Sequence, residues 1–244
     1  MQVTGYAQVK VNLTISAAAS LKEVITEAET AYKQSHANVD LSNNFGSSGT
    51  FFTQIDQGAP VDVFLSAAAK PIDELETKGL IVGGTRRNLL GNTLVLIAPL
   101  DFKPHDFQGL TSSSIWTIAL GDPVSVPADQ YGRQTFMAFH LLDKVNAKFV
   151  LAKEVRQVLT YFETGNADAG LVYATDAQAS GKVRIVAPAP ESSHEPIVYP
   201  VAVIKGGRNE GAAYKFVKYL SGPAAQARCY TRSDGDQRGS TGTR

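Results

Sequence analysis

The sequence lacks several features that define large classes of protein. Its 244 residues contain one cysteine, Cys229, which excludes an internal disulfide and a cysteine-based zinc cluster. Lysine plus arginine number 23, as do aspartate plus glutamate, so the formal net charge is zero. No apolar run approaches the roughly 18 residues of a membrane-spanning helix. The absence of excess positive charge argues against a nucleic-acid partner.

The two ends of the chain are also poor in structural features. The N-terminal stretch MQVTGYAQVKVNLTIS has neither the basic start nor the apolar core of a signal peptide. By itself this leaves two expectations open, a cytoplasmic chain or a chain whose signal has been removed. Residues 228–244 contain almost no apolar side chains, so we expect a disordered tail there.

No catalytic or phosphate-binding motif is present. The four histidines are scattered without a metal-ligand spacing, at His36, His105, His140 and His194. The chain has no Walker loop, no Gly-x-Gly-x-x-Gly after a strand and no Gly-x-Ser-x-Gly elbow. A Ser/His/Asp triad could still assemble in space, but no residue is nominated for it.

Short apolar runs alternate with segments of helical periodicity along most of the chain. Hydrophobic residues make up 43% of the composition, enough for a sizeable core. Strands are expected at 9–16, 39–43, 61–67, 92–99, 115–123, 182–187 and 196–204, and 169–177 is expected to be a strand that passes into a helix start. Helices are expected at 21–32, 51–55, 70–80, 129–144, 154–165 and 211–223. This alternation predicts an α/β protein with parallel sheets covered on both faces, whose ligands bind beyond the C-terminal ends of strands.

The first predicted strand–helix junction, SAAASLKEV, illustrates the local interpretation. Ser20 is followed three residues later by Glu23 and then by an apolar periodic run, which is the pattern of a capping box. The pattern predicts that Ser20 caps the helix, and a serine in that place could also donate its hydrogen to a ligand.

Small or neutral residues recur at the strand-to-helix junctions. They are Ser20, Ser47, Ser48, Ala128, Val155 and Tyr173. Each has an ordinary explanation as a cap, turn, helix start or core residue. Together they predict several helix N-termini whose free N–H groups and positive dipole ends could converge on one anion.

Eight motifs, in order along the chain, resemble those of periplasmic molybdate-binding proteins, the substrate-binding components of molybdate ABC transporters. The resemblance covers roughly residues 11–227. The motifs are AAASL (17–21), NFGSSGTFFTQI (44–55), GAPVDVFLSA (58–67), LLGNTLVLIAP (89–99), ALGDPVSVPA (119–128), EVRQVL (154–159), AGLVYATDA (169–177) and YPVAVI (199–204).

The resemblance implies a two-lobed periplasmic-binding-protein fold of type II, with two crossing segments that form a hinge. Residues 9–92 plus 202–227 would form the first lobe and residues 93–201 the second. The crossings would lie near 93–99 and 198–204. The family's end segment is apolar, whereas this sequence departs from the pattern after Ala227.

The resemblance also implies the ligand and its site. Molybdate or tungstate would bind between the lobes without any charged side chain, and no cofactor would be needed. Carried over motif by motif, the ligand-binding residues are Ser20, Ser48, Ala128, Val155 and Tyr173. All would contact oxygens rather than the metal.

The implied protein is a periplasmic monomer without enzymatic activity, its signal peptide removed, that delivers the ion to membrane-embedded ABC permease subunits. Glu23 is expected to turn away from Ser20 when the ion is bound, because a carboxylate on the Ser20 amide would compete with the ligand. Three alternatives remain open: a binding protein for another oxyanion such as sulfate, a serine hydrolase using Ser20 or Ser48, and the sensing half of a transcription regulator. The lack of a histidine in the matched motifs argues against the second, and the lack of a basic extension argues against the third.

Overall fold

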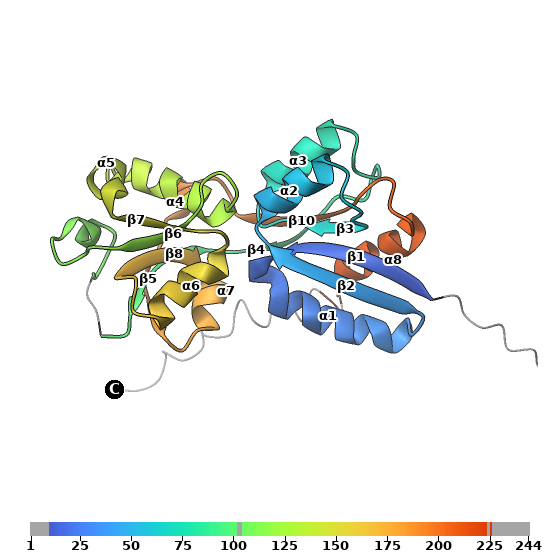
Figure 1. The fold of residues 1–244 in the computed structure, drawn as a ribbon, viewed down its shortest axis with the longest axis horizontal. Coiled ribbons are helices and arrows are strands. Elements are labelled where there is room, and N and C mark those ends of the chain that lie inside the picture. Colours follow the sequence, from blue (N-terminus) through green and yellow to red (C-terminus); the bar gives the residue numbers. More distant parts are fainter. Residues whose placement is uncertain (1–9, 102–103, 224, 226–244) are drawn as a thin grey trace, which may run out of the picture.

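The computed structural model describes residues 10–101, 104–223 and 225. Two lobes lie side by side, each built on one five-stranded sheet (Figure 1). The predicted two-lobed α/β architecture is confirmed. The predicted tail, 228–244, lies outside the described residues.

The first lobe has the strand order β2-β1-β3-β10-β4. Its strands are β1 (Val11–Ala18), β2 (Val39–Gly46), β3 (Val63–Leu65), β4 (Arg87–Gly91) and β10 (Val198–Val203). Its helices are α1 (Lys22–Ser35), α2 (Ser48–Asp56), α3 (Ala69–Thr77) and α8 (Glu210–Leu220), with the 3-10 turn η1 (Ala19–Leu21) before α1. Figure 1 shows α2 and α3 on one face of the sheet and α1 on the other.

The second lobe has the strand order β7-β6-β8-β5-β9. Its strands are β5 (Leu94–Pro99), β6 (Ile118–Gly121), β7 (Phe149–Ala152), β8 (Ala169–Tyr173) and β9 (Val183–Pro188). Its helices are α4 (Pro127–Ala138), α5 (Leu142–Val145), α6 (Val155–Glu163) and α7 (Ala174–Gln178). Three 3-10 turns complete it: η2 (Gln108–Thr111), η3 (Asn146–Lys148) and η4 (Glu191–Ser193).

Both sheets are mixed, which corrects the expectation of parallel sheets. Strand β1 runs parallel to β2 and β3, and β6 runs parallel to β7 and β8. Strand β10 is antiparallel to β3 and β4, and β5 is antiparallel to β8 and β9. β5 and β10 are the strands that the chain forms on arriving from the other lobe, so neither is placed by the right-handed βαβ connection that makes neighbouring strands parallel.

The passages between the sheets lie just before these two strands. β4 ends at Gly91 in the first sheet and β5 begins at Leu94 in the second. On the return, β9 ends at Pro188 in the second sheet, and β10 lies in the first sheet from Val198 onward. The whole of β10 therefore belongs to the first sheet, although the sequence placed the start of that lobe's second segment at residue 202.

One predicted helix is divided in two. The pattern predicted a helix over 129–144, whereas α4 ends at Ala138 and α5 begins at Leu142. His140 between them has φ 55°, a left-handed conformation that ends the right-handed helix. Periodic side chains continue across the break because both pieces bury residues in the same core, including Phe136 and Val145.

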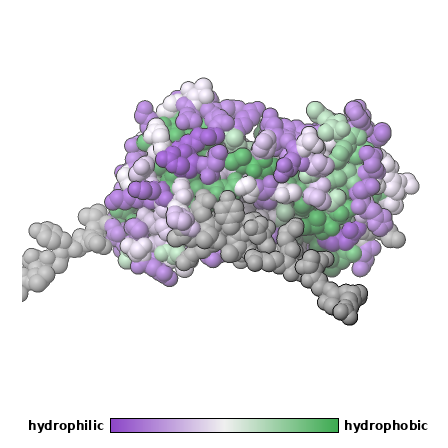
Figure 2. Space-filling view, turned by 180° about the vertical axis from the view of Figure 1, so that it is seen from behind, coloured by the Kyte–Doolittle hydropathy of each residue, from purple (hydrophilic) through white to green (hydrophobic). Residues whose placement is uncertain are grey.

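Among the described residues, no helix is both long enough and apolar enough to cross a bilayer. The face shown in Figure 2 carries hydrophilic and hydrophobic residues side by side.

Candidate functional site

A small cavity lies between the lobes where several helices begin. Its volume is about 10 Å³, room for only a small group. Its lining comes from both lobes: Ala18, Ala19, Ser20, Gly46, Ser47, Ser48, Ala67, Val126, Pro127, Ala128, Val155 and Tyr173. All five residues predicted to bind the ligand are in this lining. The structure therefore brings them together, while their contact with an ion stays a prediction.

Each of the five residues stands at the start of a helix or helical turn. Ser20 is in η1, Ser48 is the first residue of α2, Ala128 the second of α4 and Val155 the first of α6, while Tyr173 immediately precedes α7. The first N–H groups of a helix have no acceptor within it, and the helix dipole is positive at that end. The convergence expected from the sequence is present, and it makes the cavity favourable for negative charge.

The lining contains no acidic or basic side chain. Its polar side chains are the hydroxyls of Ser20, Ser47, Ser48 and Tyr173. Burial raises the pKa of Tyr173 well above its ordinary value of 10, so its hydroxyl keeps its proton. The cavity thus offers neutral hydrogen-bond donors.

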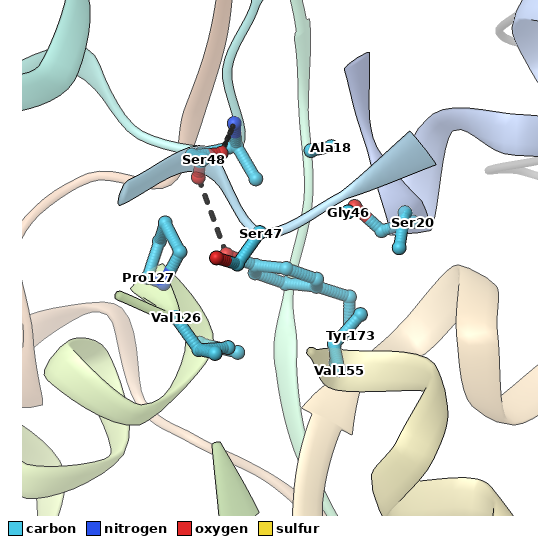
Figure 3. Close-up of a pocket in the computed structure, with 12 residues that line it drawn as sticks. Ala18, Ser20, Gly46, Ser47, Ser48, Val126, Pro127, Val155 and Tyr173 are labelled. Carbon is cyan, nitrogen blue, oxygen red and sulfur yellow. Dashed lines mark hydrogen bonds between the residues drawn. The ribbon is translucent and has the colours of Figure 1, made fainter. Parts of the chain in front are cut away.

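The backbone of Ala67 connects the two lobes at the cavity by bonding to Ser48 of the first lobe and Tyr173 of the second, which are both labelled in Figure 3. Its backbone N–H donates to Ser48 Oγ at 2.9 Å, and its carbonyl accepts from the Tyr173 hydroxyl at 3.2 Å. Since Ser48 Oγ already accepts a bond, its own hydrogen is free to point at a ligand. Tyr173 would have to turn its hydrogen from Ala67 to the ligand. Sequence reasoning missed Ala67, because an alanine after a buried strand carries no pattern of its own.

Ser20 does not cap α1, which corrects the local prediction. The helix begins at Lys22 after the 3-10 turn, with Leu21 in the capping position and no side-chain cap. Ser20 is 7% exposed, and its Oγ is buried without a hydrogen bond of normal geometry. Glu23 points across the lobes and pairs with Arg156 instead of completing a capping box. The Ser20 hydroxyl is therefore a buried donor beside the cavity without a well-formed hydrogen bond, although it lies close enough to the Tyr199 hydroxyl to lower the pKa of that group.

The cap of α2 belongs to the neighbouring serine. Ser47 Oγ accepts from the backbone N–H of Thr50 at 3.2 Å, so it satisfies one of the free amides of the helix. This division leaves Ser48 available for the cavity.

A polar network behind the cavity joins the lobes at the first crossing. Asn92, between β4 and β5, donates to the Thr175 hydroxyl and the Tyr199 hydroxyl, each at 2.9 Å. Burial raises the pKa of Tyr199 well above 10, and hydrogen bonding by Ser20 and Asn92 acts in the opposite direction. Tyr199 also packs edge-on against Tyr173 with ring centroids 5.4 Å apart.

Two buried carboxyl groups lie close to the cavity without lining it. Burial raises the pKa of Asp129, which follows Ala128, to about 6, although its bond to Arg133 at 2.8 Å lowers it. Burial raises the pKa of Asp176 to about 7; Arg156 lowers it and Glu23 raises it. No group of three or more histidine, cysteine or acidic side chains in the described part of the chain could hold a metal ion.

The fold and this cavity define the class of the protein. A family model described as bacterial extracellular solute-binding protein matches residues 13–229, and the chain belongs to that family. Within it, the resemblance to molybdate-binding proteins is confirmed. The chain is 39% identical over 220 residues to the molybdate-binding protein ModA of Escherichia coli (strain K12), covering 87% of this chain and 84% of that protein.

Two further comparisons agree. The chain is 44% identical over 218 residues to YvgL of Bacillus subtilis (strain 168), named as an ABC transporter substrate-binding lipoprotein, covering 88% of this chain and 83% of that protein. The solved structure of the periplasmic molybdate-binding protein of Azotobacter vinelandii superposes with a TM-score of 0.79 at 26% identity. That superposition covers 90% of this chain and 97% of that chain.

Proposed function

We propose that this protein binds molybdate, and also tungstate, in the cavity between its lobes and delivers the ion to the permease of an ABC transporter. The observation that carries the proposal is the set of neutral donors at five helix starts around one small cavity. Ser20, Ser48 and Tyr173 would donate from hydroxyls, and Ala128 and Val155 from backbone N–H groups. The similarity to molybdate-binding relatives supports the same ligand.

A pocket made of donors selects among oxyanions by protonation and size. Phosphate near neutral pH often carries a proton, which would find no acceptor on the ligand-facing donors, whereas molybdate and sulfate carry none. Sulfate is the smaller of these two ions, so it would not reach all donors of a cavity fitted to molybdate. Each charge-assisted hydrogen bond contributes about 1.5–3 kcal/mol, less the cost of closing the lobes.

In the proposed function, the protein acts outside the cytoplasm, in the periplasm, as a monomer. It has no catalytic activity, resident cofactor or nucleic-acid partner in this role. The cavity lining includes three serines at or beside helix starts, Ser20, Ser47 and Ser48, but no histidine, so none of them has a base within the lining. Recognition by the permease would depend on the closed, loaded shape, because the ion contacts both lobes at once.

Isothermal titration calorimetry with molybdate, tungstate, sulfate and phosphate tests the proposal. Molybdate and tungstate are expected to bind, and sulfate and phosphate to bind far more weakly. Saturating ligand at 100 times Kd should raise the free energy of unfolding by about 2.7 kcal/mol. The absence of both heat and thermal stabilisation with molybdate and tungstate would overturn the proposal, and preferential binding of sulfate would replace the ligand.

A further inference from the structure

One cation reaches from the second lobe to the first outside the cavity. The guanidinium of Arg156, in the first turn of α6, donates through Nε to the carbonyl of Ala19 at 2.8 Å. Its terminal nitrogen also pairs with the carboxylate of Glu23 in α1. Ala19 belongs to the turn that contains Ser20, and Val155, the neighbour of Arg156, lines the cavity. Arg156 therefore joins the two sides of the site without entering it.

Two other hydrogen bonds between the lobes beside the cavity differ in kind. Tyr173 donates to Ala67 with a hydroxyl that the ligand would take over. The Gly49 N–H donates to the Ser125 carbonyl at 2.9 Å, a neutral pair of backbone groups. The Arg156 contacts combine charge with two acceptors on the opposite lobe, and an ion in the cavity leaves them intact.

We propose that Arg156 is a positioning residue that clamps the closed cleft, with Glu23 and the Ala19 carbonyl as its counterparts. The inference rests on the proposed function. Because these contacts join opposite lobes, opening the cleft would break them. They therefore raise the closed fraction, and apparent affinity scales with that fraction. The side chains of Arg156 and Glu23 are 28% and 38% exposed, so water weakens the ion pair. The hydrogen bond from Arg156 to the Ala19 carbonyl strengthens the contact between the lobes.

A clamp differs in a measurable way from a cation that attracts the ligand through space. If Arg156 acted by attraction, neutralising Glu23 would increase the local positive charge and tighten binding of a dianion. If Arg156 acts as a clamp, neutralising Glu23 weakens the closed state and loosens binding. The Glu23→Gln variant therefore gives opposite signs under the two mechanisms.

The test measures molybdate and tungstate dissociation by stopped-flow fluorescence for wild type, Arg156→Ala, Glu23→Gln and Lys153→Ala. Arg156→Ala should release both ions about tenfold faster, with the association rate nearly unchanged. Glu23→Gln should act in the same direction, about threefold. Both ions should be affected by the same factor, since the clamp does not touch them. Lys153→Ala is the matched control, because the substitution removes a cation from the same part of the chain. Among the described residues, Lys153 forms no ion pair with the first lobe.

Each outcome decides the question. Unchanged release by Arg156→Ala, tighter binding by Glu23→Gln, or an equal effect of Lys153→Ala would overturn the clamp. Circular dichroism separates these results from misfolding, and Glu23→Gln tests the same contact without touching α6. If the wild-type protein itself bound neither ion, the proposed function would fail and the clamp with it. Binding by wild type with unaltered release in the variants would refute the clamp alone.

Discussion

Replacing Ser20 by alanine separates ligand binding from folding. Ser20 Oγ is buried beside the cavity and has no hydrogen bond of normal geometry within the protein. Its removal takes one charge-assisted hydrogen bond from the bound ion, worth about 1.5–3 kcal/mol. The Kd for molybdate should therefore rise roughly 10- to 100-fold. The free energy of unfolding without ligand should stay within about 0.5 kcal/mol of wild type, because no well-formed hydrogen bond is lost and only the loose contact with the Tyr199 hydroxyl disappears.

Ser48→Ala provides the contrast. Ser48 Oγ accepts from the Ala67 N–H, so the alanine variant leaves that amide unpaired in a buried place. It should lose affinity as Ser20→Ala does and also lose about 1–3 kcal/mol of stability. Ser193→Ala is the reverse control: Ser193 is buried and bonded to Pro190, but it does not line the cavity. That variant should lose stability alone.

Calorimetric titration gives the Kd values, and urea denaturation without ligand gives the stabilities. Wild-type affinity in Ser20→Ala would refute the assignment of this hydroxyl to the ion. A stability loss in Ser20→Ala as large as in Ser48→Ala would refute the reasoning that Ser20 makes no well-formed hydrogen bond within the protein.

Three further predictions concern closure, the tyrosine donor and pH. In Gly49→Ala the new Cβ would lie 2.7 Å from Ser125 Cα, so the lobes cannot close fully. Calorimetry should show that the affinity for molybdate falls at least about tenfold, while the free energy of unfolding without ligand stays unchanged. Wild-type affinity would contradict this. Tyr173→Phe should lower affinity about tenfold in the same titration, since it removes a donor to the ion. An unchanged Kd would exclude Tyr173 as a ligand. The folded-state pKa of Asp176, about 7, lies above its ordinary value of 3.8, so the stability that comes from protonating Asp176 is lost as pH rises through about 7. In thermal melts of the ligand-free protein, Asp176→Asn should be more stable than wild type at pH 8.5, and the difference in stability should be smaller at pH 5.5. Parallel pH profiles of the two proteins would contradict this.

Much of the fold could be predicted because its determinants are local. The apolar run of β1 and the helical spacing of α1 are both legible in sequence, and the structure has β1 at Val11–Ala18 and α1 at Lys22–Ser35. The short strands β4 (Arg87–Gly91) and β7 (Phe149–Ala152) were not predicted as strands of their own. Both lie at sheet edges, where partial exposure blurs the apolar pattern.

Local rules failed where a distant residue decided the outcome. Ser20 and Glu23 have the spacing of a capping box, yet the chain enters α1 through a 3-10 turn and Glu23 turns to Arg156. That arginine is 133 positions away along the chain, so no pattern near Glu23 could indicate it. The break at His140 is a similar case, because the residues on both sides pack in one core and keep the apolar spacing.

The sequence by itself determined, to within a few residues, where most helices begin, and that the residues at those starts are mostly neutral. These properties follow from periodicity and residue type over a few positions. Only the tertiary structure decided that Ser20 and Ser48 of one lobe face Ala128, Val155 and Tyr173 of the other around one cavity. The physical reason is that amide and hydroxyl donors become an anion site only when they converge, and packing of both sheets sets those distances.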